Sequence, residues 1–140
     1  MQNRTIEIKC RLNEKEADLL WRANSLKQIE RAKEIIAFIH THYAEKITVE
    51  DIAYQIGISR SECFRCFKRF TNKRPVEYII EYRLSKAAKL LRETETSVMA
   101  ISLICGFENS SYFGKTFKKK YAVTPLQYRK LGMDYNINPL

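Results

Sequence analysis

The stretch from Thr48 to Arg69, TVEDIAYQIGISRSECFRCFKR, decides the fold of this chain, because a related stretch, SVMAISLICGFENSSYFGKTFKK, recurs from Ser97 to Lys119. The glycines of the two copies, Gly57 and Gly106, lie 49 positions apart. The second copy carries one extra residue just after its glycine, since three further pairs lie 50 positions apart: Phe67 and Phe117, Pro75 and Pro125, Tyr78 and Tyr128. Such a repeat predicts two structural units of the same kind in tandem.

The first copy carries start and stop signals for two short helices. Thr48 and Asp51 fit the N-cap and the acidic third residue of one helix, and Ser59 and Glu62 repeat that arrangement for the next. Gly57 stands between them and tolerates the positive φ that a tight turn often needs. A helix, a short turn and a second capped helix form the supersecondary unit with which many proteins read DNA.

The helix after Ser59 is predicted to bury one side and to present a basic side to solvent. Helical spacing places four residues on the buried stripe: Cys63, Cys66, Phe67 and Phe70. The outward side carries Ser61, Arg65, Lys68 and Arg69. Arg65 is the candidate base reader, since its planar guanidinium can bond two acceptors on guanine. Phe64 lies at the exposed edge, where it either folds onto apolar surface or contacts a thymine methyl group.

The second copy predicts the same pair of helices with a weaker first cap. Ser97 is the expected N-cap, but Ala100 replaces the acid. Its helix is expected to pack through Val98, Ile101, Leu103 and Ile104. The next helix begins near Ser110 and is expected to bury Phe113, Thr116 and Phe117, with these residues outward or at its edges: Ser111, Tyr112, Gly114, Lys115, Lys118 and Lys119. Thr124, Pro125 and Gln127 together mark the start of a last short helix.

The spacing of apolar residues predicts an all-α fold with seven helices between residues 29 and 131. The first runs from Ile29 to about Tyr43, and a long linker helix runs from Pro75 to about Arg92. The expected domains are a helix-turn-helix subdomain at 29–74, the linker helix at 75–92, a second subdomain at 93–131 and a tail at 132–140.

Residues 1–28 are expected to be an N-terminal extension or the remnant of a sensory domain. Residues 5–12 alternate between apolar and polar side chains, which predicts a short strand. Asn13, followed by Glu16 at the third helical position, then opens a short helix through Leu19, Leu20 and Trp21.

The net charge of the chain indicates which kinds of partner it favours. Its 140 residues carry a formal net charge of +9, which favours polyanions such as nucleic acid or an anionic membrane surface. No apolar run approaches the roughly 20 residues of a membrane span, and the first residues lack the apolar core of a signal peptide. We therefore expect a cytoplasmic protein with no membrane partner.

The cysteines allow a second hypothesis. Cys63 and Cys66 have the spacing of half a zinc site, but no second pair matches them, and His40 and His42 point to different faces of a helix. Small buried hydrophobic side chains are the favoured interpretation. A thiol- or metal-based sensor, or a DNA-repair adaptor that uses these cysteines, is the alternative. No nucleophile elbow, phosphate-binding glycine loop or spaced carboxylate pair is present, so we expect no enzyme, cofactor or metal.

Several motifs resemble the DNA-binding domain of AraC/XylS-type transcription regulators. They are Gly57-Ile58-Ser59 with Phe67-Lys68, Cys105-Gly106-Phe107, Ser111-Tyr112-Phe113, Phe117-Lys118-Lys119 and Thr124-Pro125-Leu126-Gln127-Tyr128-Arg129. The resemblance covers residues 29–130 and implies two subdomains whose recognition helices enter successive major-groove segments. It implies base contacts from Ser61, Phe64, Arg65, Ser110, Ser111, Tyr112, Gly114 and Lys115. Asn72 and Ala122 depart from it, since the family often has glycine there. Asparagine tolerates the left-handed conformation, whereas Ala122 would either strain it or require a different helix end.

The resulting prediction is a sequence-specific, double-stranded DNA-binding transcription regulator, and most members of the family are activators. Lys68, Arg69, Lys118 and Lys119 are the expected phosphate contacts. One chain should suffice for one site, and a missing sensory domain would allow a dimer. RNA polymerase is a further candidate partner. A non-specific architectural DNA-binding protein is the remaining alternative.

Overall fold

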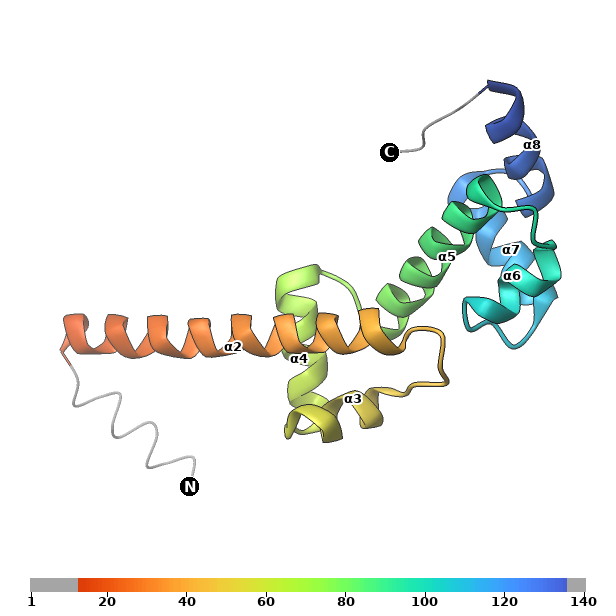
Figure 1. Cartoon of the computed structure of the whole chain (residues 1–140). Coiled ribbons are helices and arrows are strands. Elements are labelled where there is room, and N and C mark those ends of the chain that lie inside the picture. Colours follow the sequence, from red (N-terminus) through yellow and green to blue (C-terminus); the bar gives the residue numbers. More distant parts are fainter. Residues whose placement is uncertain (1–12, 136–140) are drawn as a thin grey trace.

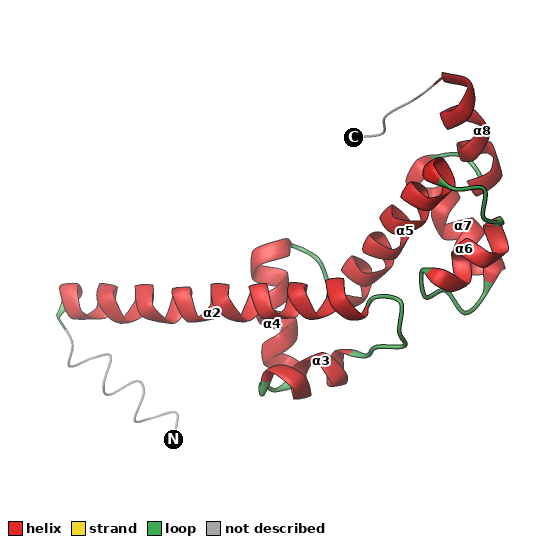
Figure 2. Cartoon of the chain, in the orientation of Figure 1, coloured by secondary structure: helices red, strands yellow, loops and turns green. Residues whose placement is uncertain are grey.

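A computed structural model describes residues 13–135, in which the chain forms seven helices and no strand (Figures 1 and 2). The helices are α2 (Glu14–His42), α3 (Val49–Ile56), α4 (Arg60–Thr71), α5 (Pro75–Glu93), α6 (Val98–Ile104), α7 (Ser110–Tyr121) and α8 (Pro125–Tyr135). The predicted all-α fold and the seven helices are confirmed. The strand expected at residues 5–12 lies outside the described residues.

The helices form two units that share α5 (Figure 1). The first unit packs α2, α3 and α4 against the N-terminal part of α5, around a core that includes Ile35, Ile52 and Phe67. The second packs α6, α7 and α8 against the C-terminal part of α5, around a core that includes Leu91 and Phe117. Each unit buries an apolar face of every helix it contains, so each has a core of its own.

The predicted caps begin and end the helices. Thr48 and Asp51 form a complete capping box, and Gly57 ends α3 in the left-handed conformation at φ 79°. Thr124 and Gln127 bond reciprocally at the start of α8, at 3.0 and 3.2 Å. Ser97 accepts a single bond, from the amide of Ala100, as expected of a cap without an acid. Local sequence therefore sets most helix boundaries.

The N-terminal helix differs from the prediction. A new helix was expected at Ile29, but α2 is continuous over 29 residues, and Asn13 forms its capping box with Glu16. No glycine or proline lies between Asn13 and Ile29, so nothing ends the first helix before the second pattern begins. The boundary proposed between residues 28 and 29 thus falls inside a helix.

Several side chains expected in the cores are exposed or only partly buried. Phe70 is exposed because it lies in the last turn of α4, beyond the helices that cover Cys63 and Phe67. Leu103 and Ile104 are exposed because α6 has only seven residues and packs through Ile101 and Ser102. Thr116 is half-buried, and its hydroxyl donates to the carbonyl oxygen of Tyr112 at 2.7 Å. Periodicity gave the side of each helix but overstated how far the core extends.

Candidate nucleic-acid interface

Helix α4 presents a polar, basic stripe on the side away from the first core. Ser61, Arg65 and Lys68 are all exposed and lie within one face of the helix, as their spacing predicts. Ser59 accepts a hydrogen bond from the amide of Glu62 at 3.1 Å and so fixes where this helix begins. Within residues 13–135, neither Arg65 nor Lys68 forms an ion pair, so both charges are available to an anion.

Phe64 folds onto the protein. It is half-buried and packs against the first core, and the Arg60 guanidinium lies 5.3 Å from its ring centroid. Arg60 also pairs with Glu50 of α3 at 3.0 Å. These contacts favour the apolar-packing interpretation of Phe64 over a ring directed outward.

The opposite edge of α4 is joined to α2. Glu62 pairs with Arg31, and Arg69 donates to the side-chain oxygen of Gln28. Cys66 Sγ donates to the main-chain oxygen of Gln28 at 3.0 Å. Arg69 therefore has a protein partner, whereas Arg65 has none among the described residues. Glu62 does not complete the capping box with Ser59 because its carboxylate is used by Arg31.

Helix α7 presents the equivalent stripe of the second unit. Asn109 is its N-cap and accepts from the amides of Ser111 and Tyr112 at 2.8 and 3.1 Å. The exposed residues of the stripe and its edges are Ser110, Ser111, Lys115, Lys118 and Lys119. Gly114 has open space where a Cβ atom would stand, so this part of the helix surface offers close approach to its backbone.

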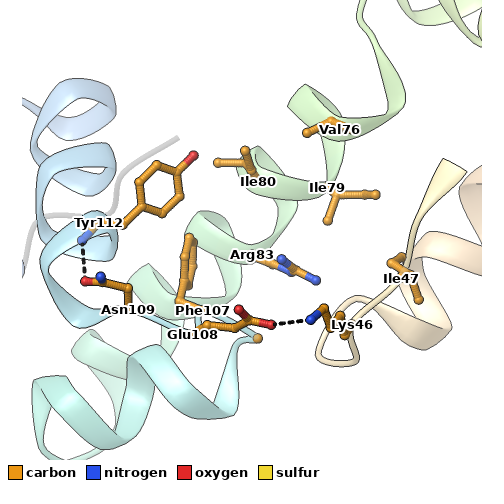
Figure 3. Close-up of a pocket in the computed structure, with 11 residues that line it drawn as sticks. Lys46, Ile47, Val76, Ile79, Ile80, Arg83, Phe107, Glu108, Asn109 and Tyr112 are labelled. Carbon is orange, nitrogen blue, oxygen red and sulfur yellow. Dashed lines mark hydrogen bonds and ion pairs between the residues drawn. The ribbon is translucent and has the colours of Figure 1, made fainter.

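Tyr112 lies at the edge of α7 that faces the first unit. Its side chain is 50% exposed and its ring centroid is 6.4 Å from that of Phe107. It lines a cavity of about 330 Å³ between the units, with its ring turned toward Ile80 (Figure 3). The ring thus has an apolar neighbour on the protein, while the hydroxyl end is open.

Two polar residues that shape this surface were not singled out from the sequence. Asn109 is the N-cap of α7 and directly precedes Ser110, near which this helix was expected to begin. Arg83 bonds the loop that joins α2 to α3, and no local pattern distinguishes it from other arginines of a solvated helix. The cap could have been found from the residue type, because asparagine is a preferred N-cap. The arginine contact depends on tertiary structure.

The three cysteines among the described residues are buried and unlike reactive thiols. Burial raises the pKa of Cys63 to about 11, with a contribution from Cys66, and burial also raises that of Cys105 to about 11. Burial raises the pKa of Cys66 as well. Thiolates are the metal-binding and nucleophilic form, so this environment opposes both roles. Residues 13–135 contain no group of three potential metal ligands.

The two units thus define a fold with a pair of helix-turn-helix motifs on one shared helix. The chain belongs to the AraC/XylS-type family of helix-turn-helix DNA-binding domains, since a helix-turn-helix domain family matches residues 52–131.

Relatives of known sequence and structure agree with this assignment. The chain is 46% identical over 101 residues to the uncharacterized HTH-type transcriptional regulator YdeC of Bacillus subtilis, covering 72% of this chain and 35% of that protein. It is 34% identical over 100 residues to the lactose operon transcription activator of Staphylococcus xylosus, covering 71% of this chain and 36% of that protein. The chain therefore spans about a third of the length of these relatives.

Solved structures of the family superpose on both units. An AraC-type DNA-binding domain protein from Chromobacterium violaceum matches with a TM-score of 0.70 at 30% identity, covering 76% of this chain and 95% of that one. The DNA-binding domain of AdpA in complex with a target DNA matches with a TM-score of 0.71 at 25% identity, covering 76% and 97%. Among the described helices, none is both long and apolar enough to cross a membrane.

Proposed function

We propose that this chain is the DNA-reading part of a transcription regulator and that it binds one double-stranded site through both units. The observation that carries the proposal is the matched pair of exposed stripes, Ser61-Arg65-Lys68 on α4 and Ser111-Lys115-Lys118 on α7, each 50 positions from its counterpart. Each stripe lies on the second helix of a helix-turn-helix, the helix that enters a major groove in such proteins.

The residues of the stripes divide by chemistry into base readers and phosphate contacts. Arg65 can donate two parallel hydrogen bonds to the acceptors of a guanine edge, and Lys115 occupies the same place on α7. Base contacts are proposed for Ser61 and Arg65 on α4, where Phe64 offers only the exposed part of its half-buried ring. On α7 they are proposed for Ser110, Ser111, Tyr112, Gly114 and Lys115. Lys68, Arg69, Lys118 and Lys119 are proposed to contact phosphates, which position the protein without reading sequence.

The dimensions of α5 support simultaneous contact by both units. Its 19 residues span about 28 Å at 1.5 Å per residue, close to the roughly 34 Å of one DNA turn. The residues equivalent to Phe64 and Arg65 in the second unit are Gly114 and Lys115. Because these pairs differ in chemistry, the two halves of the DNA site should differ in sequence. We therefore propose an asymmetric site of about 15–20 base pairs bound by one chain.

Activation of transcription is the proposed outcome of binding. The named relatives are transcription regulators, and one is described as an operon activator. Activation requires contact with the transcription machinery, so RNA polymerase is the proposed protein partner. Neither catalysis nor a resident cofactor is part of this proposal.

Selection of binding sites from random duplex DNA, followed by footprinting, tests the proposal. We expect one asymmetric sequence protected on one face of the duplex by a single chain. Competition with random DNA separates a specific reader from an architectural protein, which would bind both equally. A palindromic site occupied by two chains, each with one unit engaged, would contradict the proposal.

A further inference from the structure

The two units contact each other beside α5 as well as through it. The contact consists of the loop at residues 43–46, Arg83 in the middle of α5, and the turn at residues 106–108, which we call the inter-unit joint. Figure 3 shows Arg83 between the segment that carries Lys46 and the segment that carries Phe107. The loop belongs to the first unit and the turn to the second.

Two nitrogens of the Arg83 guanidinium donate hydrogen bonds to the first unit. Nε donates to the main-chain oxygen of Tyr43 at 2.6 Å, and Nη2 donates to that of Glu45 at 2.8 Å. Tyr43 is the C-cap of α2, where carbonyl oxygens have no partner within the helix. A cation at this end is also favoured by the helix dipole. Arg83 thus fixes the direction in which the chain leaves α2.

Gly106 brings the second unit against the same atoms. A Cβ atom on this residue would lie 2.8 Å from the Tyr43 oxygen and 2.9 Å from Arg83 Nε, and its φ of 93° already disfavours other residues. The turn after α6 therefore packs directly on the loop after α2, with no side chain between them. Lys46 and Glu108 add an exposed ion pair across the joint at 3.5 Å.

A second set of contacts between the units lies on a different side of α5. Glu81 pairs with Lys73, from the segment before α5, and its main-chain oxygen accepts from Lys120 Nζ of α7 at 3.3 Å. Glu81 and Arg83 are two positions apart and so point to different sides of the helix. Both units are therefore held to α5 from two directions.

We infer that Arg83 and Gly106 are positioning residues that hold the two helix-turn-helix units in one orientation, and that this orientation sets the spacing between the two DNA segments the chain binds. The first part stands on the contacts alone; the second rests on the proposed function. Units joined only by α5 could twist or bend relative to each other. Binding to DNA would then cost the entropy of fixing their orientation.

A distance measurement tests the orientation without DNA. Tyr54 and Leu103 occupy equivalent exposed positions on α3 and α6 and can both be replaced by cysteine for spin labelling. The native thiols at 63, 66 and 105 are buried, and Cys10 is replaced by serine in every variant. We expect a single narrow distance distribution in this protein and a broader one after Arg83→Gln.

Arg129 supplies the matched control. Its Nε donates to the Leu91 oxygen at 3.0 Å and its Nη2 to the Thr96 oxygen at 2.5 Å, so it bonds the end of α5 as Arg83 bonds the end of α2. All of these atoms belong to the second unit. Arg129→Gln should lower stability in the way Arg83→Gln does but leave the distance distribution narrow. An equally narrow distribution for Arg83→Gln would overturn the inference.

Binding to duplexes with altered spacing tests the second part. The selected site is lengthened or shortened by one and two base pairs between its halves, and affinity is measured for each duplex. Arg83→Gln should lose about tenfold at the selected spacing and show a weaker dependence on spacing. An equal loss of affinity at every spacing would overturn the inference that the orientation of the units sets the spacing of the DNA segments. If no specific site exists, the proposed function fails while the distance measurement still decides the orientation.

Discussion

In the first unit the recognition helix is joined to its neighbour at one edge, whereas the equivalent edge in the second unit is open. Glu62 and Arg69 of α4 bond Arg31 and Gln28 of α2. Their counterparts 50 positions later are Tyr112 and Lys119, and Tyr112 faces the cavity between the units. The same fold therefore gives the two recognition helices different neighbours along this edge.

The cores also differ in chemistry. Isoleucines make up much of the first core, together with Cys63 and Phe67. The second core contains three buried phenylalanines: Phe107, Phe113 and Phe117. On the outside, Tyr54 and Gln55 of α3 are matched by the exposed apolar Leu103 and Ile104 of α6. The two copies share the same pattern of helices and turns, whereas the residues that fill their cores and cover their surfaces differ.

The largest expected effect comes from the paired core phenylalanines. Phe67→Ala and Phe117→Ala should each lower the free energy of unfolding by about 3–5 kcal/mol, because both side chains are fully buried. Urea unfolding followed by circular dichroism measures the loss. If only one unit unfolds in each variant, the transitions become biphasic; a loss below about 1 kcal/mol would contradict the assigned cores.

The two turn glycines should respond unequally to the same change. Gly57→Ala strains a left-handed residue, but the added Cβ atom would have no neighbour within 4 Å, so about 1–2 kcal/mol should be lost. Gly106→Ala adds a clash with the Tyr43 oxygen and should cost about 1–3 kcal/mol more. Thermal unfolding of both variants measures the difference, and equal losses would place no close contact at Gly106.

Alkaline pH should destabilise both units through their buried thiols. Cys63 and Cys105 have folded-state pKa values of about 11, raised from 9.0, so each contributes stability that is present below pH 9 and lost as the pH rises through 11. Each loss should be at most about 2–3 kcal/mol. The free energy of unfolding is measured from pH 7 to 11 for the unchanged chain, Cys63→Ala and Cys105→Ala, which gives the contribution of each thiol. Matching pH profiles in all three would refute a role for these thiols in the alkaline loss of stability.

Arg65 and Lys68 distinguish base reading from phosphate contact on one helix. Arg65→Ala should cost about 1–3 kcal/mol on the selected site and relax preference at one base pair. Lys68→Ala should weaken every sequence similarly and reduce the salt slope by about one, as should Lys118→Ala in the second unit. Titrations at several salt concentrations check this; equal losses from Arg65→Ala on selected and random DNA would make Arg65 a phosphate contact.

The smallest expected effect is at the ends of the recognition helices. Ala122 is left-handed at φ 67°, and Asn72 occupies the equivalent end of α4 at φ 58°. Ala122→Gly should raise the free energy of unfolding by about 1 kcal/mol, because glycine relieves the strain. Asn72→Gly should change it by less than about 0.5 kcal/mol, since asparagine tolerates this conformation. A destabilising Ala122→Gly, measured by thermal unfolding, would be the contrary result.

Sequence by itself determined the tandem arrangement, the helix ends and the side of each recognition helix that faces solvent. These features depend on interactions within a few residues: Thr48 caps its own helix, Gly57 adopts its own φ, and Arg65 follows the helical period. The predicted strain at Ala122 is likewise a property of one residue. Local rules hold because the partners are fixed by chain connectivity.

Only the tertiary structure decided how far α2 extends, which apolar residues leave the core, and how the units meet. Phe70 and Leu103 satisfy the helical pattern but have no opposing helix to cover them. Arg83 bonds carbonyl oxygens about 40 positions away, and Gly106 is required by a backbone from the other unit. Such contacts join residues that are distant along the chain, so no local pattern encodes them, and they exist only once both units have packed on α5.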